Sequence, residues 1–559
     1  MPLKAGPFAG SLRRPDETLS DAQAGVTLGL ESVPDGMASA VLSGVDPVFG
    51  LHAAMVSLIV GGLRTSTELM SVTTTSAMAV AVGAALGPLA GQARIDALFL
   101  LTLLIGGMML LFGLLRLGAL VRFLSHEAMA GFLTGIGVLI IFSQIPTIIG
   151  VGTGESHVIL AGVDGLLHIG QADPATLFVG IGTIAMILLL GRTRMKNLSM
   201  VASVVAMSAL AAVLGTGVPA VADIGSIGSV LPSPVLPDLS LLTPDLVAWA
   251  FFISIVGLAQ GAGIAQTSPN QRGKRSEPSR DFTAQGMANI ASGFLQGMPT
   301  GGSISASVLV KAAGARTRLA NILAGVSILL MLLFLGQWVL QLALPALAGL
   351  LVVAGMQVIR PDRLVKIWRT NYEARTVMVL TFAATIVLPI IYAIIASVLL
   401  SAILFVYKSS LQVRVIEVVP LPGGSFSERR APTHLPSEKV TILDFHGSLF
   451  YAGAWTVERH LPRPEGSYRA VVVLRLHGHT EIGSTFVEVM ERYSRALRES
   501  GGRLMVAGAG RHVMRQLERT GTIGGLGREN IFPEGEVLED AIFAAFKTGQ
   551  RWIEERGKG

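Results

Sequence analysis

The run ALFLLTLLIGGMMLLFGLL (97–115) decides the fold class, because its nineteen residues include no charged side chain. As a helix rising about 1.5 Å per residue, it is long enough to cross the roughly 30 Å hydrocarbon core of a bilayer. The whole chain has a similar character: of 559 residues, 14% are charged and 51% are hydrophobic. Soluble globular proteins carry about 25% charged residues. We therefore expect a polytopic α-helical membrane protein that is embedded in the lipid bilayer.

Further apolar runs extend from this stretch in both directions. Shorter runs rich in Gly or Thr lie between the clear ones, and the run 376–407 is long enough for two helices hinged near Pro389. Together they predict about fourteen transmembrane segments in a domain 21–408, after a polar N-terminal segment 1–20. The runs are 49–63, 72–88, 128–145, 174–191, 198–216, 246–266, 283–298, 304–314, 319–337, 338–358 and 376–407.

Lys and Arg residues cluster in alternate loops, as at 192–196, 272–280 and 360–375. The loops 146–173 and 217–245 carry acidic residues but neither Lys nor Arg. Loops rich in positive residues stay in the cytoplasm, so we expect both termini on the cytoplasmic side of the cell inner membrane. The net charge of +6 is thus explained by topology, and a nucleic-acid partner is not expected.

The chain changes character after Lys408. Strand-like runs (KVTILDF, YRAVVVLRL and RLMVAG) alternate with helix-like runs (STFVEVMERYSRALRES and EDAIFAAFKTG). This alternation predicts a soluble α/β domain over 409–559, in which 420–438 is a connector rich in Pro, Ser and charge. Gly508-Ala-Gly510 imitates a phosphate-binding loop, but the other glycines of that fingerprint are missing, which favours a tight turn from strand to helix.

Two stretches in the membrane domain match across about 230 residues. STELMSVTTTSAMAVAVGAALG (66–87) and GMPTGGSISASVLVKAAG (297–314) both open with a hydroxyl-rich, extended-type segment and then become helical. Glu31 and Gln260 are separated by nearly the same offset. Two halves of seven helices each insert with opposite orientation, which is the inverted repeat of secondary transporters.

Three motifs resemble one known family. PDGMASAVLSGVDPVFGLHAA (34–54) and AQGMANIASGFLQGMPTGGSISAS (284–307) are similar to segments of the sulfate permease (SulP) family, the bacterial relatives of the family 26 solute carriers; HGSLFYAGA (446–454) is similar to the start of its STAS domain. The resemblance implies a seven-plus-seven inverted repeat with core and gate subdomains, as in uracil transporters. It also implies a cytoplasmic STAS domain, a homodimer and anion transport by an elevator-like movement.

Several positions depart from the family pattern. The family often has Gln at Asp35 and an acidic residue at Gln260, and it frequently has Ser-Arg-Ser where this chain has Ser305-Ala-Ser307. A fixed cation beside the site is therefore missing. The STAS loop that often reads Asp-x-Thr-Gly is 483–486 (GSTF) here, which argues against a phospho-switch.

The two matching stretches also supply the candidate substrate site. A helix N-terminus carries unpaired N–H groups and about half a positive charge, and two such ends can bind an anion without a buried arginine. Gln260 would donate to substrate oxygens. Alternatively, the hydroxyls bond to helix carbonyls or let helices pack closely. The candidate substrate-binding residues are Thr73, Thr74, Thr75, Ser76, Gln260, Ser303, Ser305, Ala306 and Ser307.

Glu31 is the candidate proton-coupling residue, because it lies inside the first apolar span, three residues before Pro34. An acid at membrane depth faces a cavity or a partner, and a proton bound there offsets the charge of the transported anion. Asp35, four residues later, is the second candidate. A carboxylate that only caps or links helices is the alternative.

The expected function is secondary active transport of a small anion: proton-coupled symport of a dicarboxylate (fumarate or succinate), bicarbonate or sulfate. Alternatives are an anion exchanger, a nucleobase carrier of the same fold, and a membrane-anchored signalling scaffold that acts through the STAS domain. The sequence shows no catalytic triad and no paired-carboxylate hydrolase signature, and its ten histidines follow no metal-ligand spacing. We expect neither an enzyme, nor a metal, nor a cofactor.

Overall fold

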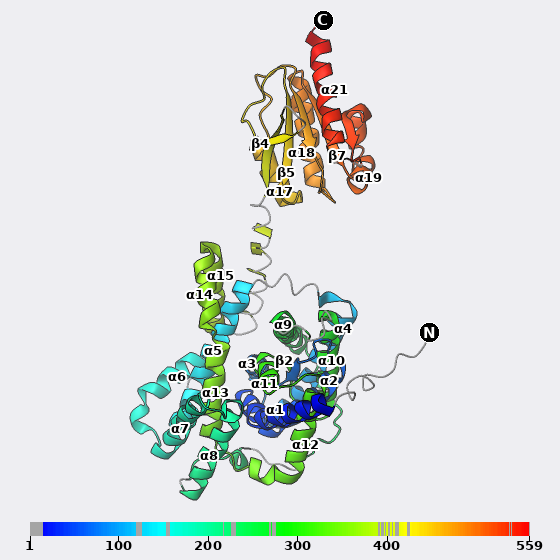
Figure 1. The fold of residues 1–559 in the computed structure, drawn as a ribbon. Helices are drawn as coiled ribbons and strands as arrows, with labels where there is room; N and C mark the ends of the chain where they lie inside the picture. Colours follow the sequence, from blue (N-terminus) through cyan, green and yellow to red (C-terminus); the bar gives the residue numbers. More distant parts are fainter. Residues whose placement is uncertain are drawn as a thin grey trace. The chain divides into compact units, whose positions relative to one another are not determined.

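The structure, a computed structural model, contains two compact units, Met1–Ser401 and Ala402–Gly559. The first is helical, and the second contains a six-stranded sheet (Figure 1). The predicted boundary at Lys408 lies outside the described residues and stays a prediction. The described residues are 15–118, 126–152, 157–215, 217–224, 231–267, 270, 276–388, eight residues between 392 and 407, 413–421, 425–535, 537 and 539–557.

Seven helical stretches in the described part of the chain are long and apolar enough to cross a membrane. Each predicted apolar run up to residue 387 contains a helix, but the run 72–88 begins in a strand and the run 338–358 crosses the break between two helices. Pro389 lies outside the described residues. The helices are α1 (Pro15–Leu42), α2 (Pro47–Arg64), α3 (Ser76–Leu86), α4 (Gly91–Leu114), α5 (His126–Ile149), α6 (Val158–Leu167), α7 (Pro174–Leu190), α8 (Ser199–Val213), α9 (Pro244–Thr267), α10 (Pro278–Phe294), α11 (Ile304–Ala312), α12 (Leu319–Val339), α13 (Leu344–Val358), α14 (Pro361–Thr370) and α15 (Tyr372–Val387).

Helix α1 begins at Pro15, inside the polar segment 1–20. Proline suits the first position of a helix. Helices α6 and α14 lie in two of the charge-defined loops, and each has only ten residues, too few for a span.

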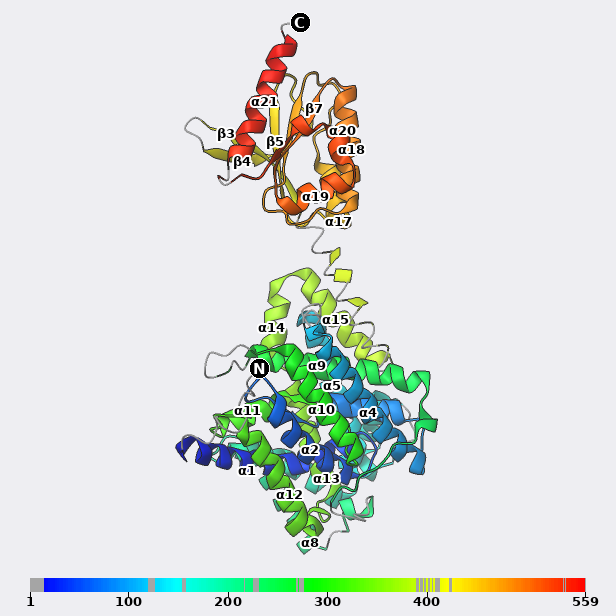
Figure 2. The same ribbon diagram turned by 90° about the vertical axis from the view of Figure 1, so that its right-hand side faces the viewer.

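The helices pack in two groups (Figures 1 and 2). In the core group (α1–α4 and α9–α12), α10 packs against α4 and α2, and α12 packs against α1 and α2. In the gate group (α5–α8 and α13–α15), α5 packs against α13 and α15, and α7 against α8 and α13. Each group therefore contains helices from both halves of the membrane domain.

A two-stranded ladder joins the two halves inside the core group. Strand β1 (Ser71–Thr73) pairs antiparallel with β2 (Gly301–Ser303), with Val72 opposite Gly302. Each strand leads directly into a short helix, β1 into α3 and β2 into α11. The predicted change from extended chain to helix is confirmed in both stretches. Because the strands run in opposite directions, α3 and α11 start from opposite ends of this short ladder and lead away in opposite directions.

Two buried carboxylates hold the turn that precedes β1 and the turn between α11 and α12. Asp281 at the start of α10 accepts hydrogen bonds from the amides of Ser66 (2.5 Å) and Thr67 (3.1 Å) and from both hydroxyls. Asp21 in α1 accepts from the amides of Arg316 (2.7 Å) and Thr317 (3.0 Å). Each carboxylate thus fixes a turn that belongs to the opposite half of the chain.

Asp281→Asn is expected to destabilise the fold. The asparagine cannot accept all four of these hydrogen bonds, and a buried group left without a partner costs about 1–3 kcal/mol. The midpoint of thermal unfolding in detergent should fall measurably. Glu277→Gln, the same charge change on an exposed side chain one turn earlier, is the matched control and should unfold like the wild type. Equal midpoints for Asp281→Asn and the control would contradict this role.

The C-terminal unit is an α/β sandwich with strand order β4-β3-β5-β6-β7-β8. The strands β5 to β8 are parallel, and β3 pairs antiparallel with β4 and β5. The predicted strands and helices are confirmed, but the predicted connector 420–438 contains β4. Its residues are mostly polar because β4 is an edge strand. The strands are β3 (Arg414–Pro420), β4 (Phe426–Arg430), β5 (Val440–His446), β6 (Val471–Arg475), β7 (Arg503–Ala509) and β8 (Ile531–Pro533).

Helices cover both faces of this sheet (Figure 2). One face packs against α17 to α20, and the other packs against α21. The predicted tight turn after β7 is confirmed: Gly508 has a φ of +73° and α19 begins at Arg511. A Cβ atom on Gly508 would also lie 3.1 Å from that of His477. The helices are α17 (Tyr451–His460), α18 (Ser484–Glu499), α19 (Arg511–Arg519), α20 (Thr522–Leu526) and α21 (Asp540–Gly557).

Candidate functional site

A cavity of about 500 Å³ lies between the core group and the gate group. The core group contributes residues of α1, α3, α9 and α11, and the gate group contributes residues of α5, α8, α13 and α14. Most of the predicted site residues line it, although they come from four elements distant in sequence. Those that do are Glu31, Asp35, Thr74, Thr75, Ser76, Gln260, Ser303, Ser305 and Ala306.

The N-termini of α3 and α11 meet at this cavity. Thr75 is the N-cap of α3, and its hydroxyl accepts from the amide of Met78 (3.4 Å). Ser303 is the N-cap of α11, and its hydroxyl accepts from the amide of Ala306 (3.3 Å). Ser305, the second residue of α11, is exposed and lines the cavity. Two partly positive helix ends therefore converge on one space, as an anion site requires.

Small residues let this arrangement form. A Cβ atom on Gly302 would lie 2.7 Å from the Cα atom of Gly261, and one on Gly301 would lie 3.2 Å from that of Gly257. Strand β2 thus lies directly against the backbone of α9. The PTGGS sequence before α11 supplies glycine where any larger residue would separate the two elements.

Carboxamide side chains of α10 and α12 hold the chain at β1 and β2 through hydrogen bonds. Asn289 of α10 accepts from the amide of Thr300 (2.7 Å) and donates to its carbonyl (2.7 Å), and Gln285 accepts from the amide of Gly302 (3.0 Å). Asn321 of α12 donates to the carbonyl of Met70 (3.0 Å) and accepts from the hydroxyl of Ser71 (2.7 Å). The helix ends are therefore held in place before any ligand arrives.

Three buried polar groups at this location lack hydrogen-bond partners among the described residues: the hydroxyls of Thr73 and Thr74 and the carboxamide oxygen of Gln260. Thr73 and Thr74 are each only 1% exposed. Burial of an unpaired polar group is costly. Thr74 and Gln260 line the cavity, so a bound ligand can supply the missing partners.

Two predicted residues do not line the cavity. Thr73 lies in β1 opposite Gly301. The hydroxyl of Ser307 donates to the carbonyl of Ser303 (2.6 Å) and accepts from the amide of Ser71 (3.0 Å). Ser307 therefore joins the two strands, which is the alternative role considered for these hydroxyls.

Both candidate acids line the cavity on one face of α1. The helix continues through Pro34, so Glu31 and Asp35 stay one turn apart. Oε2 of Glu31 lies 3.4 Å from the amide nitrogen of Val201 in the first turn of α8. Glu31 thus bridges the core group to a helix N-terminus of the gate group. This contact fits the helix-linking role as well as the coupling role.

The cavity also contains residues that the sequence did not single out. Gate-group residues among them are His126, Lys196, Asn197, Gln357, Arg360 and Arg363. Lys196, Arg360 and Arg363 were interpreted only as markers of cytoplasmic loops. The sequence feature that could have suggested a place in the site is the position of these residues at the ends of apolar spans.

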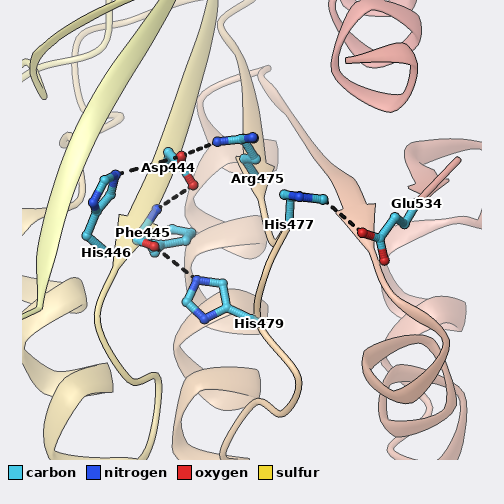
Figure 3. A network of polar contacts seen from close by, with 7 residues as sticks. All are labelled: Asp444, Phe445, His446, Arg475, His477, His479 and Glu534. Carbon is cyan, nitrogen blue, oxygen red and sulfur yellow. Dashed lines mark hydrogen bonds and ion pairs between the residues drawn. The ribbon is translucent and has the colours of Figure 1, made fainter. Parts of the chain in front are cut away.

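A second polar cluster lies at the carboxyl ends of the parallel strands of the C-terminal unit (Figure 3). Asp444 and Arg475, opposite each other in β5 and β6, form an ion pair (2.5 Å). His477 contacts Glu534 (3.0 Å), and Nε2 of His479 lies 3.0 Å from the carbonyl oxygen of Phe445. The two histidines lie in the turn after β6, which ends at Arg475.

This cluster fits a structural role. No group of three or more His, Cys, Asp or Glu residues within the described ranges is placed to hold a metal ion. Elsewhere in the unit, the hydroxyl of Tyr493 donates to the carbonyl of Pro462 (2.7 Å), and burial raises the pKa of this phenol. Such contacts stabilise the packed unit.

Comparison with known proteins identifies the two units. The sulfate permease family profile matches residues 19–381. The chain belongs to the sulfate permease family. The STAS domain profile matches residues 434–534 of the second unit. This family member is therefore a multi-pass membrane transporter with a C-terminal STAS domain.

Relatives and solved structures extend this assignment. The probable sulfate transporter MT1781 of Mycobacterium tuberculosis is 28% identical over 385 residues, which are 68% of this chain and 69% of that protein. The overall structure of SLC26A9 has a TM-score of 0.83 at 17% identity and covers 97% of this chain and 92% of its own. The transmembrane domain of the cyanobacterial bicarbonate transporter BicA has a TM-score of 0.60 at 20% identity. That match covers 69% of this chain and 98% of the BicA chain. At these identities the structures establish the fold of this sulfate permease family member.

Proposed function

We propose that this protein is a secondary active transporter of a small anion, coupled to protons. The observation that carries the proposal is the meeting of the α3 and α11 N-termini at one cavity beside unpartnered polar groups. Helix ends, amides and hydroxyls bind an anion without covalent chemistry. A small dicarboxylate such as fumarate or succinate, bicarbonate and sulfate are the candidate substrates. Proteins named as sulfate and bicarbonate transporters are among those that this chain resembles.

The proposed architecture is a seven-plus-seven inverted repeat with an elevator-like movement. The antiparallel β1–β2 ladder and the packing of α4 with α10 and of α12 with α2 support the repeat. The location of the cavity between the core and gate groups supports the movement, because sliding one group past the other would carry the helix ends across the membrane. We also propose a homodimer, which the family resemblance implies, in the inner membrane. The loop charges support the position of both termini in the cytoplasm.

A radiolabelled uptake panel in proteoliposomes tests the function. Succinate, fumarate, bicarbonate and sulfate are compared with uracil, each with and without an inward proton gradient. Gradient-driven uptake of an anion supports the proposal. Uptake of uracil alone would indicate a nucleobase carrier, gradient-independent anion swapping would indicate an exchanger, and no uptake of any compound would favour a signalling scaffold.

Glu31→Gln is expected to abolish accumulation driven by the proton gradient while preserving anion binding and exchange. An anion entering an inside-negative cell works against about 2.3 kcal/mol per charge per 100 mV, and a proton carried on Glu31 cancels part of this. Glutamine imitates the protonated acid permanently and also weakens the contact with Val201. Uptake is compared with and without the gradient.

Asp35→Asn is the matched control, since it removes a carboxyl group from the same face of α1. It should keep the gradient response. If Asp35→Asn loses this response and Glu31→Gln retains it, the proton travels on Asp35 and the role assigned to Glu31 is wrong.

A further inference from the structure

Three cationic residues line the cavity, all from the gate group. Lys196 lies in the short 3-10 helix η3 (Lys196–Leu198) that precedes α8, Arg360 follows α13, and Arg363 lies in the first turn of α14. All three occupy loops whose charge predicts a cytoplasmic position. The helix ends at Ser303 and Thr75 belong to the core group. An anion in the cavity is therefore attracted by the partial positive charges of the core-group helix ends and by the full positive charges of the gate-group side chains.

Among the described residues these three charges form no ion pair within 4 Å and no side-chain hydrogen bond, although the carboxylate of Asp362 acts on Arg360 from a greater distance. Other arginines of the described ranges do bond with acids or carbonyls: Arg94, Arg280, Arg375, Arg469, Arg475, Arg492, Arg498, Arg503 and Arg515. Arg360 and Arg363 are half-buried, whereas Lys196 is exposed. A partly desolvated guanidinium without a counter-ion in contact attracts anions more strongly than a solvated one.

The core group supplies only partial positive charges to the site, beside the carboxyl groups of Glu31 and Asp35. Its lining has no cationic side chain, and Ala306 occupies the position where the family frequently has arginine. Partial charges at two helix ends bind one anionic group well but do not compensate a second full charge. The full positive charges that line the cavity are those of the gate group.

We propose that Lys196, Arg360 and Arg363 form a second anion subsite, which makes the cavity selective for doubly charged anions over singly charged ones. The proposal rests on the proposed function and adds the substrate class: a small dianion such as a dicarboxylate or sulfate. The interaction energy with a fixed charge is proportional to the charge of the anion. A dianion therefore gains twice as much from this subsite as a monoanion.

Loop topology alone does not explain the three residues. Lys366 and Arg369 lie on the same helix α14 and satisfy the same charge rule, but neither lines the cavity. Both are exposed. The double variant Lys366→Gln/Arg369→Gln thus provides a matched control that removes nearby positive charge without touching the subsite.

The test compares wild type, the control and the triple variant Lys196→Gln/Arg360→Gln/Arg363→Gln. Uptake kinetics are measured in proteoliposomes for sulfate and succinate as dianions and for bicarbonate and formate as monoanions. With three partly screened charges removed, we expect KM to rise about tenfold for dianions and by the square root of that factor, about threefold, for monoanions. The dependence of KM on salt should weaken in the triple variant.

Binding of radiolabelled sulfate to purified protein in detergent separates this inference from the proposed function. Salt-sensitive binding that the triple variant loses and the control keeps supports the subsite, even if proteoliposomes show no uptake. Equal changes in KM for dianions and monoanions, or equal losses in the triple variant and the control, would overturn it. Because all three side chains are replaced by polar residues at the cavity or surface, we expect the triple variant to unfold at the wild-type temperature.

Discussion

Ser305→Trp is expected to abolish transport and to leave the protein folded. Ser305 is exposed in the first turn of α11 beside the Ser303 cap, and it lines the same cavity as the start of α3. An indole ring there fills the space between the two helix ends, which an anion must enter to reach their amides. Because the serine side chain does not pack against its neighbours, the larger group needs no rearrangement of the core.

Uptake and size-exclusion profiles are measured together for this variant. Lys311→Trp, on the same helix but outside the cavity lining and exposed, is the control and should transport normally. Ser76→Trp at the start of α3 should reproduce the loss from the other side. Thr74 is less suitable because its side chain is buried. A well-folded Ser305→Trp protein that transports at the wild-type rate would remove the helix ends from the site.

Gly50→Ala is expected to prevent normal folding of the membrane domain. Helices α1 and α2 cross at Gly36 and Gly50, and a Cβ atom on Gly50 would lie 1.9 Å from the carbonyl oxygen of Gly36 and 2.6 Å from its carbonyl carbon. Both are backbone atoms, so no side chain can rotate away. Overpacking in a dense interior costs about 1–3 kcal/mol and more where the backbone must move, and close helix crossings depend on small residues.

The yield of monodisperse protein and its unfolding midpoint measure this effect. Gly107→Ala is the matched control, because Gly107 lies within α4 and a Cβ atom there meets nothing within 4 Å. Helix propensity favours this control change by about 1 kcal/mol. If Gly50→Ala gave wild-type yield and midpoint, the close crossing of α1 and α2 would be refuted.

The sequence predicted those parts of the fold that a local pattern encodes. Charge-free runs located the helices, and the hydroxyl-rich openings of 66–87 and 297–314 located the two short helices that meet at the cavity. The ladder between Ser71–Thr73 and Gly301–Ser303 was not predicted, because three-residue strands have no periodicity and their pairing depends on packing against α9, α10 and α12. Strand β4 was missed for a related reason: at an exposed edge its polar residues resemble a linker.

The candidate site was predicted in part. The core-group residues could be found because both halves of the chain repeat them, and the structure brings Thr74, Gln260 and Ser305 to one cavity. Lys196 and Arg360 could not be assigned to it. A positive residue at the end of a span satisfies the topology rule wherever its side chain points, and only the packing of α8, α13 and α14 determines which of these residues reach the cavity.

The ladder between β1 and β2 also has a consequence for biosynthesis. The partner of Ser71–Thr73 is translated about 230 residues later, and at roughly 5–20 residues per second this takes on the order of 10–50 s. During that interval the nascent chain holds unpaired strand amides and carbonyls inside the bilayer, where no water can satisfy them. We therefore expect the nascent chain to be most prone to aggregation between the synthesis of its two halves. This period ends when Gly301 and Gly302 pack against α9 and β2 pairs with β1.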